Sequence, residues 1–276
     1  MSDSLHILLT NDDGINSPGI RALYDELSAI GSVTTVAPAT DKSAIGRAIS
    51  HEVEVTDHEL GYAVHGTPSD CVVAGLSELC PTNCPDLVVS GCNKGANLGE
   101  YVLGRSGTVS AAVEAAFFDV PAIATSLYVP TGDLAFNEIE TTPEDYALAA
   151  DATRYLAERG LEAGIFDVAT YLNVNAPMPE RSDEPLDLTP LEITRPSTRY
   201  EMDASRNADA ITLHDRVWEE MDPDATPDPD GTDRRAVAEG RISVSPLTAP
   251  HSVTTPDTLT ELIESYGRLE RASSSE

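Results

Sequence analysis

Two adjacent carboxylates at the end of an apolar run are the first residues of this sequence that could do chemistry. Asp12 and Asp13 follow the run HILLT at 6–10. Two carboxylates about 4 Å apart repel each other by about 4 kcal/mol at an effective dielectric constant of about 20. A divalent cation offsets that repulsion, and Gly14 permits the turn through which both side chains can face one ion. The alternative is a solvated loop in which one of the two aspartates caps the following helix.

Side chains with oxygen atoms also follow two other apolar, β-branched runs. Ser43 comes after the run 33–37, and Asn93 comes after the run 86–90. Such runs, alternating with helical stretches, indicate a parallel α/β sheet, in which the loops that leave the strand ends emerge at one edge. We therefore expect these two side chains and the paired aspartates to meet in one cleft. Oxygen ligands of this kind suit Mg²⁺ or Mn²⁺.

A glycine-rich stretch and a helix start near Asn93 could hold a phosphate. Three glycines within 91–99 let the backbone approach a ligand closely, while Asn97 adds an amide and Lys94 a positive charge. The residues Ser-Gly-Thr at 106–108 open an expected helix, whose free N–H groups and dipole favour an anion. The alternative is a set of tight turns without a ligand. A Walker A motif and a G-x-G-x-x-G motif after the first strand are both lacking, which disfavours a dinucleotide oxidoreductase.

Apolar runs and helical stretches alternate along the first 178 residues. We expect strands at about 5–10, 33–37, 86–90, 121–126 and 168–174, with short strands at 48–55 and 61–65. Helices are expected over 18–30, with Gly31 at the end, over 68–79 and 143–158, and in TVSAAVEAAFF at 108–118. This alternation predicts an α/β fold with a core over residues 1–178.

Beyond Pro177 proline and aspartate become dense, which indicates a C-terminal extension over residues 179–276. In it we expect β segments at 187–194, 208–213 and 241–247 outside the main sheet, and a terminal helix at about 257–271. The acidic segment 219–235 is interpreted as an exposed, mobile loop. We expect this extension to serve subunit contacts.

The chain is strongly acidic along its whole length. It carries 47 Asp and Glu against 17 Lys and Arg, a formal net charge of −30. This balance argues against a stable nucleic-acid partner, because phosphate backbones require a basic surface. We interpret the acidic surface as an adaptation to high intracellular salt, which screens the self-repulsion. No leader sequence and no apolar run of about 18 residues is evident, so we expect a cytoplasmic protein without a membrane partner.

Four cysteines are present, at Cys71, Cys80, Cys84 and Cys92. The second and third form a C-x3-C spacing, and no other pair has the spacing of a zinc ribbon. We interpret all four as reduced and mostly buried side chains. A zinc site is the alternative.

Several segments of this sequence resemble, in the same order, those of the SurE family. The matching segments are LLTNDDGINSPGIRAL (8–23), VAPATDKSAIGRAI (36–49), GTPSDCV (66–72), PDLVVSGCNKGANLG (85–99), SGTVSAAVEA (106–115) and PAIATS (121–126). GRISVSPL at 240–247 resembles a late segment of that family. The resemblance spans about residues 5–250 and is most specific up to about residue 126.

The resemblance implies a Rossmann-like three-layer core with a mostly parallel sheet, followed by a β-hairpin and helix extension through which a homodimer or homotetramer assembles. It also implies a metal-dependent phosphatase that acts on nucleoside monophosphates and uses one divalent cation per subunit, Mg²⁺ or Mn²⁺. The positions that match the metal ligands are Asp12, Asp13, Ser43 and Asn93. Those that match the phosphate side are Asn97, Ser106, Gly107 and Thr108, and Asn93 adjoins both sets.

We therefore expect a phosphomonoesterase with 5′-nucleotidase activity, in which Asp12 and Asp13 are the catalytic carboxylates. One of them would accept the proton of an attacking water, and a covalent aspartyl-phosphate remains the alternative route. A nucleotide- or phosphate-binding module without catalysis is the competing interpretation of the whole chain.

Three positions depart from the family pattern. Cys92 stands where the family usually has Ile, Ala44 where Gly is usual, and Arg105 where a Tyr is frequent. These changes leave the expected metal ligands intact. A cationic Arg105 beside the phosphate site would strengthen anion binding.

Overall fold

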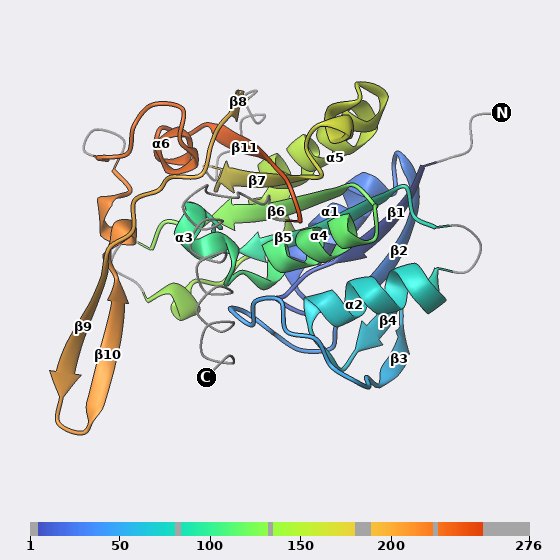
Figure 1. The fold of residues 1–276 in the computed structure, drawn as a ribbon, viewed down its shortest axis with the longest axis horizontal. Coiled ribbons are helices and arrows are strands. Elements are labelled where there is room, and N and C mark those ends of the chain that lie inside the picture. The colour runs from blue at the N-terminus through green and yellow to red at the C-terminus, as the bar shows by residue number, and fades with distance from the viewer. Residues whose placement is uncertain (1–4, 81–83, 132–134, 180–188, 223–225, 251–276) are drawn as a thin grey trace, which may run out of the picture.

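The computed structural model describes residues 5–80, 84–131, 135–179, 189–222 and 226–250. Within these ranges the strands of the central sheet are β1 (Leu5–Thr10), β2 (Gly31–Pro38), β3 (Val55–His58), β4 (Gly61–Val64), β5 (Leu87–Lys94), β6 (Ala122–Tyr128), β7 (Tyr171–Pro177), β8 (Leu191–Ile193) and β11 (Ile242–Leu247). Their order across the sheet is β3-β4-β2-β1-β5-β6-β7-β11-β8 (Figure 1). The strands from β4 to β7 run parallel, while β3 and β11 are antiparallel to their inner neighbours.

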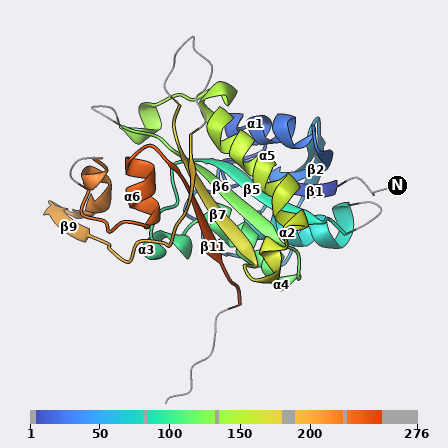
Figure 2. The ribbon, with the colours of Figure 1, turned by 90° about the horizontal axis from the view of Figure 1, so that it is seen from above.

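Helices cover both faces of this sheet, which makes a three-layer α/β fold (Figure 2). One face carries α1 (Pro18–Leu27) and α5 (Ala147–Glu162), and the other carries α2 (Pro68–Ala74) and α4 (Gly107–Phe117). In β1, Ile7 and Leu9 belong to the first core cluster and Leu8 to the second. A strand buried on both faces reads as a continuous apolar run, which is why the sequence predicts this one well.

Most expected elements are confirmed, with shifted boundaries, but the short strand expected at 48–55 is wrong, because β3 begins only at Val55. Ser17 caps α1 and Ser106 caps α4, each by accepting a hydrogen bond from a backbone N–H of the first turn. The first helix ends at Leu27, and Gly31 opens β2 instead of ending that helix. A Cβ at Gly31 would lie 2.2 Å from the carbonyl oxygen of Leu5 in the adjacent strand, so the glycine is required by strand pairing.

Two β segments expected outside the main sheet belong to it. β11 pairs antiparallel with β7, and β8 pairs parallel with β11, so the expected separation of 187–194 and 241–247 is wrong. The remaining segment forms a hairpin, β9 (Met202–Asn207) with β10 (Ala210–Asp215), which projects from the body of the molecule (Figure 1). The division of the chain near residue 178 stays a prediction, and the helix expected at 257–271 lies outside the described residues.

The acidic segment 219–235 is an exposed loop only in part of its described length: Glu219 and Asp230 are exposed, but other charged residues are not. Asp228, Asp233 and Arg234 are buried, and Arg234 pairs with Asp228 at 3.3 Å. Its guanidinium also donates to the hydroxyl of Ser197 at 2.7 Å. Charged groups can be buried here because each finds an opposite charge or a polar partner, which composition alone does not reveal.

The four cysteines are all free, as expected. Cys71 and Cys92 are buried, Cys80 is partly buried and Cys84 is exposed, so the expectation of burial holds for two of them. Among the described residues no three His, Cys, Asp or Glu side chains gather in a way that could hold a metal ion, so the zinc alternative gains no support. No helix of the described chain is long and apolar enough to cross a bilayer.

Candidate functional site

Loops from the carboxyl ends of three neighbouring strands form a cavity of about 360 Å³ at one edge of the sheet. We call it the Asp12 cavity. The residues of the expected site that line it are Asp12, Ser43, Asn93, Asn97 and Ser106. The loops after β1 and β2 are joined by a hydrogen bond of 2.7 Å from the Lys42 backbone N–H to the Asp12 carbonyl. Residues far apart in the sequence thus meet where the strand pattern predicts.

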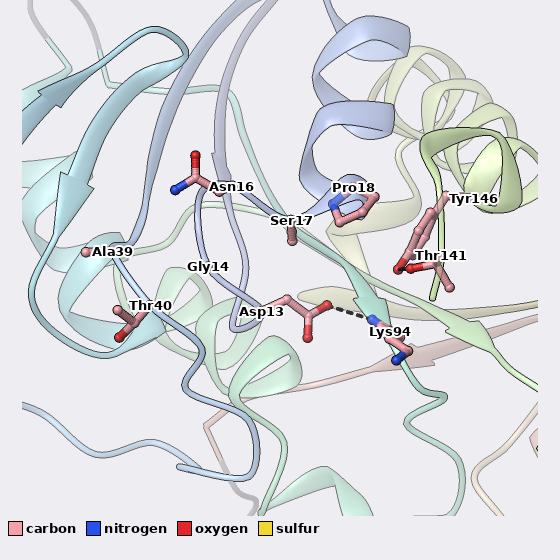
Figure 3. Close-up of a pocket in the computed structure, with 10 residues that line it drawn as sticks. All are labelled: Asp13, Gly14, Asn16, Ser17, Pro18, Ala39, Thr40, Lys94, Thr141 and Tyr146. Carbon is pink, nitrogen blue, oxygen red and sulfur yellow. Dashed lines mark hydrogen bonds between the residues drawn. The ribbon is translucent and has the colours of Figure 1, made fainter. Parts of the chain in front are cut away.

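Asp13 lines a neighbouring cavity of about 360 Å³, the Asp13 cavity, so the expected single cleft is divided (Figure 3). Lys94 borders both cavities. In Figure 3 the Asp13 carboxylate points toward the backbone nitrogen of Lys94 on β5. Successive side chains of a strand point to opposite sides, and the two carboxylates line different cavities although the chain turns at Gly14, which has φ +95°.

Asp12 is nearly fully buried and is held by the start of α4. Its Oδ1 accepts a hydrogen bond from the Thr108 hydroxyl at 2.5 Å, and its Oδ2 accepts one from the Thr108 backbone N–H at 3.1 Å. A Cβ at Gly107 would lie 2.8 Å from Asp12 Oδ2, so only glycine allows this approach. Thr108 and Gly107, expected on the phosphate side, are therefore placed directly against the first carboxylate.

Asp13 is held by the neighbouring strand β5. Its Oδ2 accepts a hydrogen bond of 2.7 Å from the Lys94 backbone N–H (Figure 3). Burial and the neighbouring negative charge of Asp12 raise the pKa of Asp13 from 3.8 to about 7. Burial also raises the pKa of Asp12, despite the two hydrogen bonds from Thr108.

A bulge in β5 aims Asn93 at the Asp12 cavity. The pairing of β5 with β6 shifts register between Ser90 and Asn93. Gly91 makes this possible, because at φ +137° a Cβ there would lie 2.2 Å from the carbonyl oxygen of Thr125. The strand expected to end at residue 90 consequently runs on to Lys94. The amide nitrogen of Asn93 donates to the carbonyl of Gly95, which leaves its amide oxygen as the group available to a ligand.

This donor set fits a divalent cation of the hard, oxygen-preferring class. The ligand types that Mg²⁺ or Mn²⁺ accepts are present: a buried and a partly buried carboxylate with raised pKa values, an amide oxygen from Asn93 and the hydroxyl of Ser43. The Ser43 hydroxyl donates to Asp41 at 2.6 Å, so its oxygen lone pairs remain for an ion. A cation between the carboxylates would remove the cost of burying two adjacent negative charges.

Asn97 sits in a cluster of buried amides that the sequence analysis missed. Its backbone N–H donates to Asn175 Oδ1 at 2.7 Å, and its side-chain amide donates to the Ser126 hydroxyl at 2.8 Å. Its carbonyl accepts a hydrogen bond of 2.9 Å from Asn173. The signal was present in LNVNA at 172–176, where two asparagines on one face of a core strand require buried partners.

A second missed residue comes from the far end of the chain. Asp233, at the start of α6 (Asp233–Ala238), accepts a hydrogen bond of 2.7 Å from the Gly99 backbone N–H. It also accepts one from the Ser197 backbone N–H at 2.9 Å. The loop that carries Asn97 is thus held at its end by a buried carboxylate of the C-terminal region.

The two cations expected near the phosphate have other partners as well. Lys94 Nζ donates to the carbonyls of Phe136 and Ile139, at 3.1 and 2.6 Å. Arg105 lines the Asp12 cavity, lies 3.7 Å from Asp215 and stacks over the Tyr101 ring at 4.2 Å. A direct contribution of Arg105 to anion binding stays a prediction.

A family model and several relatives of known name match this chain. The family model described as "Survival protein SurE" matches residues 7–203. A "5'-nucleotidase SurE" of Haloarcula marismortui is 60% identical over 265 residues, 96% of each chain. A protein of the same name from Methanothermobacter thermautotrophicus is 37% identical, over 93% of this chain and 96% of that protein.

The fold has a matching solved structure, titled "Crystal Structure of Sure Protein from Aquifex aeolicus". It superposes with a TM-score of 0.72 and 30% sequence identity, and the match covers 95% of this chain and 99% of that one. Sequence and fold agree over nearly the whole length, and the motifs of the expected site lie in the matched region. The chain therefore belongs to the SurE family.

Proposed function

We propose that this chain is a divalent-metal-dependent phosphomonoesterase that hydrolyses nucleoside monophosphates to nucleoside and phosphate. The observation that carries the proposal is the pair of adjacent carboxylates at a strand end, Asp12 buried and Asp13 partly buried, next to amide and hydroxyl oxygens and an anion-favouring helix start. Relatives named 5′-nucleotidase cover almost the entire chain and support the same activity. A binding module without catalysis is disfavoured because both carboxylates are present.

Each side chain has a distinct task in this proposal. Asp12, Asp13, Ser43 and Asn93 would hold one Mg²⁺ or Mn²⁺ ion per subunit, which when bound would polarise the phosphoryl oxygens and offset both carboxylate charges. Thr108 keeps the Asp12 carboxylate in one orientation, and the Lys94 backbone N–H does the same for Asp13. Asn97 and Ser106 border the same cavity, where they would contact the phosphate.

The nucleophile is one of the two aspartates or a water that one of them deprotonates. In-line attack on phosphorus requires the attacking and leaving oxygens on opposite sides. Each carboxylate lines a cavity of about 360 Å³, which has room for a water molecule or part of a substrate. If water attacks directly, its oxygen becomes part of the released phosphate. If an aspartate attacks, a water then cleaves the aspartyl-phosphate, supplies that oxygen and restores the carboxylate. In both routes the leaving oxygen of the nucleoside takes up one proton.

The decisive experiment measures phosphate release from AMP, GMP and UMP in molar KCl with Mg²⁺ or Mn²⁺. We expect turnover with the ion, loss of turnover in excess chelator, and recovery when the ion is restored. Full activity after complete removal of divalent cations would reject the role of the metal. Tight binding of AMP without phosphate release would instead favour the binding module.

We further propose a homodimer or homotetramer assembled through the region after residue 178, in the cytoplasm of a salt-rich cell and without a stable nucleic-acid partner. The projecting β9–β10 hairpin, with Ile211 58% and Leu213 70% exposed, supports assembly because such side chains favour a covered position. The net charge of −30 supports the salt-rich location and the lack of a stable nucleic-acid partner. Light scattering in molar KCl tests the assembly, and Leu213→Thr should shift the mass toward the monomer.

A further inference from the structure

A third cavity, of about 380 Å³, adjoins the Asp12 cavity and has a different lining. We call it the Trp218 cavity. Its walls include the rings of Phe136, Trp218 and Tyr128, and none of its described lining residues is charged. A concave site of this size with aromatic walls and few polar groups suits a flat, uncharged ring system.

The two cavities are adjacent and share part of their lining. Gly95, Ala96, Phe136 and Trp218 line both of them. A ligand whose anionic end lies near Asp12 can therefore extend an aromatic end into the Trp218 cavity. Nucleoside monophosphates have this two-part chemistry, with a charged phosphate and a planar base joined by a ribose.

Phe136 is held in position by Lys94 and Gly95. The Lys94 ammonium donates to the Phe136 carbonyl and lies 4.8 Å from the centre of its ring. Gly95 has φ +111°, and a Cβ there would lie 3.0 Å from Phe136 Cζ, so the ring packs directly on the glycine backbone. With 43% of the residue exposed, part of the ring surface stays open to a ligand.

Trp218 comes from the C-terminal region, just after the β9–β10 hairpin. Its neighbour Val217 is buried, and Asp215 lies 3.7 Å from Arg105, which also lines the Asp12 cavity. These contacts fix the segment that carries Trp218 against the core. The partly buried indole thereby forms part of the wall of both cavities.

We propose that the Trp218 cavity binds the nucleobase of the substrate, stacked on Phe136 and Trp218, while the phosphate occupies the Asp12 cavity. This inference rests on the proposed function. Stacking engages the face of the base and not its edge, so all common bases are accepted. Purines are preferred over pyrimidines because their larger rings bury more area on the two side chains.

The test uses Trp218 as its own reporter, because it is the single tryptophan of the chain. With excitation at a wavelength that adenine does not absorb, adenosine added to the protein in chelator should quench the emission. Ribose 5-phosphate and inorganic phosphate at equal concentration should leave it nearly unchanged. Unchanged emission with adenosine, or equal quenching by ribose 5-phosphate, overturns the proposal.

Kinetics provide the second measurement. In Phe136→Leu and Trp218→Leu, the ratio of kcat/KM for AMP to that for ribose 5-phosphate should fall about tenfold, the loss expected for one stacked base. Phe118→Leu, which changes an exposed ring at the far end of α4, is the matched control and should keep the wild-type ratio. A ratio that stays at the wild-type value in both cavity variants rejects the nucleobase site.

The outcomes separate this inference from the proposed function. If AMP and ribose 5-phosphate are both hydrolysed but neither substitution changes the ratio of their kcat/KM values, the proposed function is supported and the nucleobase site is rejected. If no phosphomonoester is hydrolysed with any cation, the proposed function fails, and the adenosine titration still decides whether the cavity binds a base. Weaker quenching by adenosine and guanosine than by cytidine and uridine would contradict stacking.

Discussion

The acidic side of the site, Asp12 and Asp13, and its aromatic side, Phe136 and Trp218, are held in place by different interactions. Asp12 and Asp13 accept hydrogen bonds from Thr108 and Lys94, inside a sheet and helix layer that is closely packed. Phe136 and Trp218 sit on surface segments, positioned by a cation–π contact, two carbonyl hydrogen bonds and an ion pair. The chemical groups are thus rigid, while the groups that would select the substrate are carried on segments that can vary without disturbing the core.

Loss of one carboxylate charge on the acidic side should lower activity the most. We expect Asp12→Asn to lower kcat for AMP by about 1,000-fold, because the amide neither offsets the cation charge nor keeps two strong acceptors for Thr108. Asp25→Asn, on the exposed face of α1, removes the same charge elsewhere and should retain activity. Turnover of Asp12→Asn near that of the control, with circular dichroism unchanged, would exclude a role for this carboxylate.

Removal of the Thr108 hydroxyl, which donates to Asp12, should weaken metal binding, a smaller effect than the loss of a carboxylate charge. In Thr108→Val the carboxylate loses its side-chain donor, and we expect the Kd for Mg²⁺ or Mn²⁺ to rise about 10- to 100-fold. Calorimetric titration measures it. Thr153→Val removes a buried hydroxyl that bonds Thr125 and Ala149 and lines neither site cavity, so it should leave the Kd unchanged. Equal Kd values in the two variants would mean that Thr108 supports only the fold.

A substitution in the C-terminal region should lower activity less. It acts through the loop that carries Asn97, which Asp233 holds at Gly99. We expect Asp233→Asn to lower kcat/KM for AMP about fivefold by weakening the hydrogen bond to Gly99, while the metal Kd stays within about twofold. Asp230→Asn, on an almost fully exposed neighbour, is the matched control. A loss of metal affinity equal to the loss of kcat/KM would show that Asp233 acts on the whole site and not on this loop.

The smallest expected effect is a pH dependence of metal-induced stability. Burial and Asp12 raise the pKa of Asp13 from 3.8 to about 7, so its contribution to stability is complete below pH 3.8 and is lost as the pH rises to about 7 in the metal-free protein. A cation compensates for that loss. In molar KCl, Mg²⁺ should raise Tm by about 5 °C more at pH 8 than at pH 5.5.

Thermal unfolding followed by fluorescence measures this difference. Asp13→Asn should remove most of it, because the amide does not titrate. An equal gain in Tm at the two pH values in the unchanged protein would contradict the assignment of Asp13 as a buried, metal-compensated carboxylate.

The part of the site close to the strand ends could be predicted because its signals are local. Apolar runs, the turn glycine at Gly14 and the caps at Ser17 and Ser106 each depend on a few neighbouring residues. They place Asp12 and Asn93 at one sheet edge before any coordinate is known. Local signals could not show that Asp13 would face a separate cavity, because that depends on the path of the loop beyond the strand.

The C-terminal region was predicted less well because its composition is misleading. Dense Pro and Asp in 219–235 is typical of an exposed loop, yet Asp233 and Arg234 are buried. The expected strand at 241–247 exists as β11, but its place beside β7 could not be inferred. Such pairings depend on which distant segment offers a complementary edge and enough buried area.

The alternation of strands and helices, the adjacent aspartates and the helix caps follow from the order of the amino acids, because backbone preferences and capping bonds act over a few residues. The partners of those groups come from folding in three dimensions. Thr108 reaches Asp12 across 96 positions and Asp233 reaches Gly99 across 134, and Trp218 meets Phe136 at a shared wall. These contacts exist because buried polar groups must find partners wherever packing brings them, and no short-range pattern specifies which ones those will be.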